Sequence, residues 1–294
     1  MYSDAELIGR LAGFTNNYID VNGIKLHYVR GGKGPALILI PGWPETWWAY
    51  HKVLPQLSAK YDVIAVDLRG MGSSDKPADG FDKKNMAKDI FELTQQLGIS
   101  SVNICGHDIG AHVAFSFAAN YPAATNKLIM LDTPHPDQNM YKLPMLPILG
   151  LNYTYPWWLA FNQVKQLPEA LLAGKMEIVL NWLFDQMLHD KTSLDDFDRA
   201  VYAQAYNETE SLRASNGWYQ AFTQDIQDIA TYTKIKVPTM GLASAQSMEM
   251  LAGFLKGYAE NAETFEIPNS GHFLLSENPE AVSEKMLAFL KDSN

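Results

Sequence analysis

One aspartate stands where the chain could form a covalent intermediate. Asp108 lies in the segment Gly106-His107-Asp108-Ile109-Gly110, after the apolar run Val102–Cys105 and before an apolar stretch with helical spacing. This order predicts a sharp strand–turn–helix junction that presents its central residue, a position that usually holds serine. A carboxylate is already ionised near neutral pH and needs no base to act as a nucleophile. We therefore predict that Asp108 attacks an sp³ carbon of an epoxide or a carbon–halogen bond and forms an alkyl ester; a helix-capping role is the alternative.

Hydrolysis of such an ester requires a general base that activates water. His272 is the predicted base, because it lies in a loop before the C-terminal helix and follows the nucleophile in the chain. Its imidazole needs an acid that fixes the tautomer. Asp132, directly after the apolar run Leu128–Leu131, is preferred over Glu249, because open α/β sheets build their sites at the carboxyl ends of strands. The predicted catalytic set is Asp108, Asp132 and His272.

The tetrahedral intermediate of ester hydrolysis carries an oxyanion, which backbone N–H groups can stabilise. Ile109 follows the predicted nucleophile, and its N–H is one expected donor. Trp43 lies in the segment Ile40–Pro44 at the end of another apolar run, and its N–H is the second expected donor. The alternative for Trp43 is a packed side chain in an ordinary Pro/Gly turn.

Short apolar runs separated by helical patterns surround these residues. The runs have the length and continuity of strands buried on both faces, and the stretches between them carry apolar residues at helical spacing. Strands that alternate with helices predict a mostly parallel sheet covered by helices. The turn Asn22-Gly23 within Tyr18–Val29 predicts an additional hairpin. The predicted strands are Ala36–Ile40, Val63–Val66, Val102–Cys105, Leu128–Leu131 and Thr239–Leu242, and the predicted helices are Asn85–Leu97, Ala111–Ala119 and Glu280–Leu290.

The alternation stops in the middle of the chain. Residues 136–234 have helix-like periodicity, no clear strand run and many aromatic side chains, and the α/β pattern then resumes. Because Asp108, Asp132 and His272 must meet in one site, we expect residues 1–135 and 235–294 to form one core domain and residues 136–234 to be an inserted helical cap. Aromatic residues of the cap are expected to wall an apolar pocket over the nucleophile; they include Tyr153, Trp157, Trp158 and Tyr219.

The composition excludes several classes of protein. The 294 residues are 47% hydrophobic and 19% charged, which is typical of a globular chain rather than a disordered or collagenous one. The net charge of −10 disfavours a nucleic-acid partner, because phosphate binding needs a basic surface. A single cysteine, Cys105, excludes an intrachain disulfide, and the absence of an apolar run of about 18 residues argues against a membrane span. The N-terminal residues lack the pattern of a signal peptide, so we expect a cytoplasmic protein, or a periplasmic or secreted one if a leader was removed.

With these motifs the chain resembles the α/β-hydrolase superfamily and, within it, the epoxide hydrolases. The segment Asp67–Pro77 is similar to the D-x-R-G-x-G-x-S motif of that superfamily. Val21–Val29, His107–Gly110 and Asp132–Asp137 are similar to the Cif-like epoxide hydrolases, the group with the nearest likeness. The resemblance implies an α/β-hydrolase fold with a helical cap, the acid role for Asp132, and epoxide hydrolysis without a metal or an organic cofactor.

The resemblance also bears on how an epoxide ring would open. Epoxide hydrolases of this kind use two donors from the cap, commonly Tyr/Tyr, or His/Tyr in the Cif-like group. Tyr219 matches the second donor, whereas Trp157 stands where the first is expected, with Tyr153 and Tyr155 nearby. An indole N–H donates a hydrogen bond but does not give up its proton at ordinary pH. The expected ring-opening donor is therefore Tyr219, with Trp157 as a second donor.

Three functions follow from these residues. The leading one is hydrolysis of a small apolar epoxide to a vicinal diol, through an ester on Asp108 that is cleaved by water activated by His272. The second is dehalogenation of a haloalkane or haloacid by the same aspartate; against it, Ile109 stands where haloalkane dehalogenases carry Trp, and the Arg residues of haloacetate dehalogenases are missing nearby. The third is a member of the fold that binds a ligand without turnover, which Trp157 and Pro41 favour. A homodimer is left open.

Overall fold

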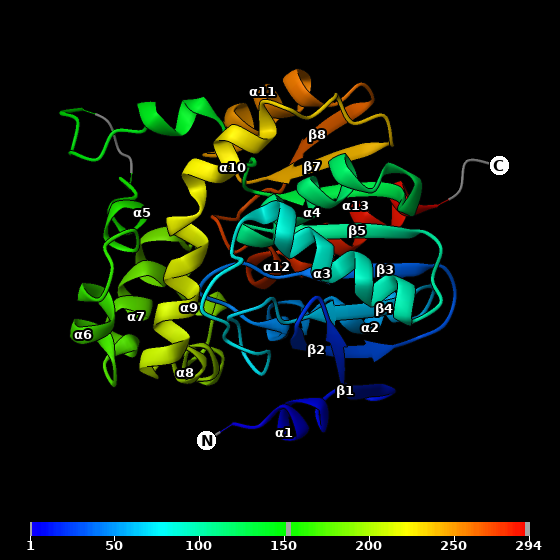
Figure 1. The fold of residues 1–294 in the computed structure, drawn as a ribbon, viewed down its shortest axis with the longest axis horizontal. Coiled ribbons are helices and arrows are strands. Elements are labelled where there is room, and N and C mark those ends of the chain that lie inside the picture. Colours follow the sequence, from blue (N-terminus) through cyan, green and yellow to red (C-terminus); the bar gives the residue numbers. More distant parts are fainter. Residues whose placement is uncertain (1, 151–153, 292–294) are drawn as a thin grey trace.

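Eight strands form one sheet at the centre of the molecule (Figure 1). The computed structural model describes residues 2–150 and 154–291. The strand order across the sheet is β1-β2-β4-β3-β5-β6-β7-β8. The neighbours from β4 to β8 are parallel, whereas β1 pairs antiparallel with β2, and β2 pairs antiparallel with β4. The strands are β1 (Phe14–Val21), β2 (Ile24–Gly31), β3 (Ala36–Ile40), β4 (Asp62–Val66), β5 (Val102–His107), β6 (Thr125–Leu131), β7 (Thr239–Ala243) and β8 (Ala262–Glu266).

The predicted fold class, a mostly parallel sheet flanked by helices, is confirmed. The strands β3 and β7 are buried at every position, as a strand covered on both faces must be. The turn between β1 and β2 is the expected one, with positive φ at Asn22 (43°) and Gly23 (78°). The edge strand β8 has a half-exposed burial pattern, which explains why no continuous apolar run marks it in the sequence.

Helices cover both faces of this sheet. In Figure 1, α3 (Lys83–Gln96) and α4 (Ile109–Asn120) cross the front, where they pack against each other, and α4 also packs on β5 and β6. Behind the sheet, α13 (Pro279–Leu290) packs against α2 (Leu54–Ser58). The remaining helices of this part are α1 (Asp4–Ile8), the 3₁₀ turns η1 (Trp47–Tyr50) and η2 (Pro122–Ala124), α11 (Met248–Tyr258) and α12 (Leu274–Glu277).

Between β6 and β7 the described residues form helices joined by loops, and the one β-type pairing among them is an isolated bridge at Ile235. The ribbons of this segment, green to yellow in Figure 1, lie beside one end of the sheet. They comprise η3 (Gln138–Lys142), α5 (Trp157–Phe161), α6 (Leu167–Leu172), α7 (Met176–Met187), η4 (Lys191–Ser193), α8 (Asp196–Ala205), α9 (Thr209–Gln220) and α10 (Phe222–Ile229). The division into a core domain and a cap domain at residues 136 and 234 stays a prediction.

Buried polar contacts join this helical segment to the sheet side of the molecule. Lys83 at the start of α3 donates from Nζ to Oδ2 of Asp225 on α10 at 2.7 Å, and to the carbonyl of Trp218 at 2.7 Å. Both members of this ion pair have fully buried side chains. The indole N–H of Trp218 in turn donates to the carbonyl of Arg69 at 2.9 Å. These contacts fix α9 and α10 over the loops that leave the carboxyl ends of the strands.

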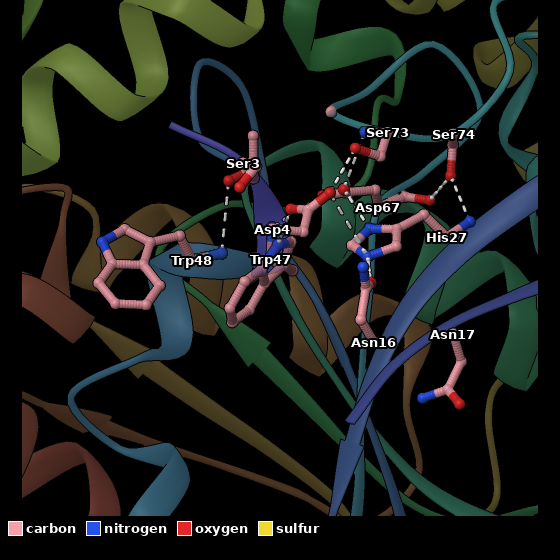
Figure 2. A network of polar contacts seen from close by, with 12 residues as sticks. Ser3, Asp4, Asn16, Asn17, His27, Trp47, Trp48, Asp67, Ser73 and Ser74 are labelled. Carbon is pink, nitrogen blue, oxygen red and sulfur yellow. Dashed lines mark hydrogen bonds and ion pairs between the residues drawn. The ribbon is translucent and has the colours of Figure 1, made fainter. Parts of the chain in front are cut away.

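A second network fixes the N-terminal helix and the loop after β3 (Figure 2). His27 on β2 is fully buried, and its Nδ1 lies 2.7 Å from Oδ2 of Asp67, just after β4. Asp67 also accepts the backbone N–H of Trp47 at 2.9 Å, while Asp4 on α1 accepts the indole N–H of the same tryptophan at 2.8 Å. Charge and hydrogen bonding from Asp67, with the charge of Asp4, raise the pKa of His27 although its burial acts to lower it. The loop that contains Trp43 is therefore anchored at its far end.

Candidate active site

Asp108 occupies a strained turn between β5 and α4. Its φ of 51° and ψ of −121° lie outside the regions that most residues adopt. A Cβ on Gly106 would lie 2.0 Å from the carbonyl oxygen of Gly110, and one on Gly110 would lie 2.1 Å from the carbonyl oxygen of Ile40. Both glycines are therefore required by close backbone contact, as the sequence pattern predicts. The turn leaves the side chain of Asp108 18% exposed, so it is available to a small molecule.

The loop after β3 meets this carboxylate. The backbone N–H of Trp43 donates to Oδ1 of Asp108 at 2.9 Å. Gly42 permits this approach, since a Cβ there would lie 2.3 Å from the Cβ of Asp108. Ile109 is the first residue of α4, and the first N–H groups of a helix have no partner within the helix. The N–H of Trp43 therefore contacts the carboxylate directly, and the role of Ile109 as a second donor stays a prediction.

His272 lies between two carboxylates. Its Nδ1 is 2.7 Å from Oδ2 of Asp132, and its Nε2 is 3.7 Å from Oδ2 of Asp108. The backbone of His272 is fixed as well: its N–H donates to the carbonyl of Met187 on α7 at 3.0 Å, and its carbonyl lies 2.8 Å from Nε2 of His107. The structure thus brings together the three residues that the sequence places on separate strand ends and loops.

Asp132 rather than Glu249 is the carboxylate beside His272. Asp132 follows β6 with a φ of 59°, and its Oδ1 accepts the backbone N–H of Ser244 at 2.7 Å and the hydroxyl of Ser247. Glu249 is exposed on α11. The segment after β7 therefore supplies hydrogen-bond donors to the acid instead of supplying the acid itself. The sequence analysis does not identify Ser244 and Ser247. The one visible signal is that no carboxylate follows β7 before Glu249, which leaves this segment free to bind an acid from elsewhere.

The charges around His272 determine its protonation. Burial lowers the pKa of a histidine, but here the hydrogen bond and the charge of Asp132, followed by the charges of Asp108 and Glu45, raise the pKa of His272 to about 9. At neutral pH the resting imidazole is therefore protonated. Loss of the charge on Asp108 would remove one of the groups that hold this pKa high.

Glu45 is a further buried group that the sequence did not single out. Its Oε2 lies 3.1 Å from Nδ1 of His107, the residue before Asp108. Its carbonyl accepts the hydroxyl of Tyr206 at 2.6 Å, and its side chain is 1% exposed. Glu45 and His107 thus form a buried pair that also contacts the backbone of His272. The only signal in the sequence is that Glu45 directly follows the Pro41–Pro44 turn.

Tyr219 on α9 faces the same region from the helical segment. Its ring meets that of Trp43 edge-on, with ring centroids 5.7 Å apart, and the residue is 2% exposed. Burial and then the negative charge of Asp108 raise the pKa of Tyr219 well above its usual value. The hydroxyl therefore stays protonated and can act as a donor close to Asp108.

Two other aromatic residues predicted for the pocket, Trp157 and Trp158, lie on α5. Trp158 is buried. The ring of Trp157 packs against Trp158, Phe161 and the half-exposed Trp182 of α7. Within the part of the chain that is described, no hydrogen bond or ring contact joins Trp157 to Asp108, His272 or Tyr219. Tyr153 lies outside the described residues.

One group among the described residues has the composition of a metal site. The ligand-type atoms of Asp4, His27 and Asp67 lie within 4.8 Å of one another. These side chains bond to one another and to Asn16, Trp47 and Ser73 instead, as Figure 2 shows.

None of the helices in the described ranges is long and apolar enough to cross a membrane.

Comparison with known proteins agrees with this geometry. Residues 35–279 match the family described as alpha/beta hydrolase fold. The chain belongs to this family. As an alpha/beta hydrolase, it is 30% identical over 285 residues to a soluble epoxide hydrolase from Corynebacterium sp. strain C12, a match that covers 94% of this chain and 96% of the relative. The resemblance to this superfamily and to its epoxide hydrolases is confirmed.

Two further matches bear on the expectations from the sequence. The fold superposes on the crystal structure of the Cif epoxide hydrolase from Acinetobacter nosocomialis with a TM-score of 0.88, over 95% of this chain and 90% of the other, at 24% identity. At that identity the match shows a shared fold. A shorter stretch of 125 residues is 36% identical to a fluoroacetate dehalogenase from Burkholderia sp., covering 41% of each chain.

Proposed function

We propose that this protein is an epoxide hydrolase that converts a small apolar epoxide to a vicinal diol through a covalent ester on Asp108. The observation that carries the proposal is the single line of groups Asp132–His272–Asp108, with the hydroxyl of Tyr219 near the nucleophile. The similarity to a soluble epoxide hydrolase along nearly the whole chain supports the choice of substrate class.

In the first step, the carboxylate of Asp108 attacks a ring carbon of the epoxide. The new bond joins an aspartate oxygen to that carbon, the carbon–oxygen bond of the ring breaks, and its electron pair stays on the epoxide oxygen. Tyr219 gives that oxygen its proton and is left as a phenolate. Its hydroxyl is protonated at rest, and its ring contacts Trp43, whose N–H donates to Asp108. Trp157, which stands at the position of the family's other donor, would contribute at most a hydrogen bond from its indole N–H.

In the second step, water hydrolyses the ester. Esterification removes the negative charge of Asp108, and this lowers the pKa of His272 from its resting value of about 9. The proton that His272 then loses restores the hydroxyl of Tyr219. The neutral imidazole then takes a proton from water, which attacks the ester carbonyl carbon. The N–H groups of Trp43 and Ile109 stabilise the oxyanion, and Asp132 stabilises the imidazolium. The diol oxygen leaves with a proton from His272, and Asp108 keeps one oxygen from water. The second proton of that water passes from Asp108 to His272, which restores the resting charges of both groups.

The test is the detection of the ester. The His272→Gln variant, incubated with styrene oxide, should accumulate an adduct on Asp108 with the mass of one epoxide, located by peptide mass spectrometry. The native protein in ¹⁸O-labelled water should carry the label on Asp108 after one turnover, while the first diol released carries none. An Asp108→Asn variant is the matched control and should form no adduct. Turnover with no adduct and no label on Asp108 would refute the mechanism.

Dehalogenation is the second candidate, because of the partial match to a fluoroacetate dehalogenase. The site offers little to hold a substrate carboxylate. His112, one turn after Asp108, is buried, and burial lowers its pKa well below the usual value, so it is a neutral group. Fluoroacetate and 1-bromobutane in the same adduct assay separate the two chemistries, since halide appears in solution only if dehalogenation occurs.

A further inference from the structure

Asn162 is a buried amide whose side chain has unused hydrogen-bonding capacity. It is the first residue after α5, where its backbone N–H donates to the carbonyl of Trp158 at 2.9 Å. Its carbonyl accepts Nε2 of Gln220, the neighbour of Tyr219, at 3.4 Å. Asn162 is 3% exposed, and its Nδ2 has no hydrogen-bond partner among the residues that the structure describes. A buried amide without a partner is unfavourable for folding, so a role in function is the natural explanation.

The hydroxyl of Tyr219 is the titratable group that this free donor influences. Burial, Asp108 and Tyr206 all raise the pKa of that hydroxyl, whereas the side chain of Asn162 acts in the opposite direction by hydrogen bonding. The backbone of Asn162 is hydrogen-bonded to Gln220, the neighbour of Tyr219, and its Nδ2 makes no hydrogen bond of ordinary length in the resting state. Hydrogen bonds of this kind are often long in a site without substrate and shorten as charge develops.

We propose that Asn162 is a positioning residue for ring opening, whose Nδ2–H donates to the oxygen of Tyr219 as that oxygen passes its proton to the epoxide. This inference rests on the proposed function. When the epoxide oxygen takes the proton of Tyr219, the electron pair of the broken O–H bond stays on the phenolic oxygen. A hydrogen bond to a charged oxygen is stronger than one to a neutral hydroxyl, so Asn162 stabilises the transition state more than the resting state.

This role accounts for the unusual residue at the predicted first donor position. Trp157 cannot supply a proton, and its ring packs toward Trp182. Tyr219 is then the sole predicted acid, and its buried position beside Asp108 makes it a weak one. A donor aimed at the phenolic oxygen offsets part of that weakness. The protein would thus open the ring with one acid, Tyr219, whose oxygen is stabilised by the amide of Asn162.

The experiment measures the rate of ester formation on Asp108 in the His272→Gln background, by rapid quench and intact-protein mass spectrometry with styrene oxide. Asn162→Leu has a similar size and lacks the donor. It should slow alkylation about 10- to 100-fold, the range expected for a lost hydrogen bond to a charged group. With His272 intact, hydrolysis of the ester once formed should change less than about twofold, because Tyr219 takes no part in that step.

A double-mutant cycle shows whether Asn162 acts through Tyr219. In the Tyr219→Phe background, Asn162→Leu should cause no further loss in the rate of alkylation. Gln220→Leu is the matched control: it removes the bond to the carbonyl of Asn162 but leaves the amide in place, and should keep the native rate. If Asn162→Leu does not fold, Asn162→Ser replaces it in the same cycle and should retain part of the rate through its hydroxyl.

Two results would overturn the inference. One is alkylation at the native rate in the folded Asn162 variant, and the other is the same loss in the Tyr219→Phe background as in the native one. Failure of the proposed function looks different, since the His272→Gln protein with Asn162 intact would then form no ester on Asp108 with any epoxide.

Discussion

The imidazole of His272 is held at unequal distances by two carboxylates, with Nδ1 2.7 Å from Oδ2 of Asp132 and Nε2 3.7 Å from Oδ2 of Asp108. The shorter contact is a hydrogen bond that fixes the ring, and the longer one exceeds hydrogen-bond length. The Nε2 side is therefore free to act on a third molecule. This asymmetry supports the proposed roles, in which Asp132 orients the ring and Asp108 is the nucleophile.

Asp132→Asn should separate these two roles. The amide keeps the shape of the acid but removes the charge that stabilises the imidazolium, and it permits the wrong tautomer of His272. We expect steady-state turnover to fall about 10²- to 10⁴-fold, with ester accumulating on Asp108 because alkylation needs no base. Glu249→Gln is the control and should turn over at the native rate, since Glu249 is exposed. A slow variant that accumulates no ester would contradict this division of roles.

The pH dependence of ester hydrolysis should reveal the change in His272. The resting pKa is about 9, and esterification removes the raising effect of the charge on Asp108, so the pKa in the ester is lower. Hydrolysis needs the neutral imidazole, and its rate should rise with pH and level off with a midpoint below the resting value. Single-turnover decay of the ester, followed across pH, measures this midpoint. A midpoint at or above the pKa that NMR gives for His272 in the resting protein would disprove the fall in the pKa of His272 on esterification.

The buried ion pair between Lys83 and Asp225 should be a strong determinant of stability. Burial raises the pKa of Asp225, and the lysine beside it opposes that effect. Lys83→Met leaves an unpaired buried carboxylate and should lower the free energy of unfolding by about 3–5 kcal/mol. The double variant Lys83→Met with Asp225→Leu should recover most of this loss, because neither charge remains. Denaturant unfolding of the three proteins provides the measurement, and equal loss in the single and double variants would show that charge is not the cause.

His27 should make stability depend on pH in a defined direction. Its folded pKa is raised, because hydrogen bonding and charge from Asp67, with the charge of Asp4, outweigh the lowering effect of burial. Its contribution is therefore fully present below the unfolded pKa of about 6.5 and is lost as pH rises through the folded value. Comparing the free energy of unfolding at about pH 6 and about pH 9 for proteins with His27 and with His27→Phe isolates this term. Both carry His272→Gln to remove its titration, and a contribution that grows toward high pH would contradict the sign.

The parts of the fold that could be predicted are those in which local pattern and burial coincide. β3 (Ala36–Ile40) has the predicted limits, and β4 differs from its predicted range, Val63–Val66, by one residue. A strand buried on both faces admits only apolar residues and is therefore visible in the sequence. β8 has only half-exposed and exposed positions at the sheet edge, so burial imposes no such pattern on it.

The site could be predicted only where one motif contains the chemistry. Asp108 sits in a turn whose neighbouring glycines are dictated by backbone contacts, and that constraint appears as adjacent letters. Asn162 and Glu45 gain their importance from helices and loops that meet in space but not in sequence. Protonation is a collective property as well: the pKa of His272 depends on carboxylates from three separate segments.

The bond between the backbone N–H of His272 and the carbonyl of Met187 has a consequence for how molecules pass in and out. Gly271 is tightly packed there, since a Cβ on it would lie 2.0 Å from that same carbonyl oxygen. If α7 moved away as a rigid lid, it would pull the loop that contains His272 out of its position beside Asp108 in every catalytic cycle. If Met187 stays in place while substrate enters and product leaves, His272 stays aligned with Asp108 from one turnover to the next. We therefore expect the segments that move to be ones that do not contact the His272 loop.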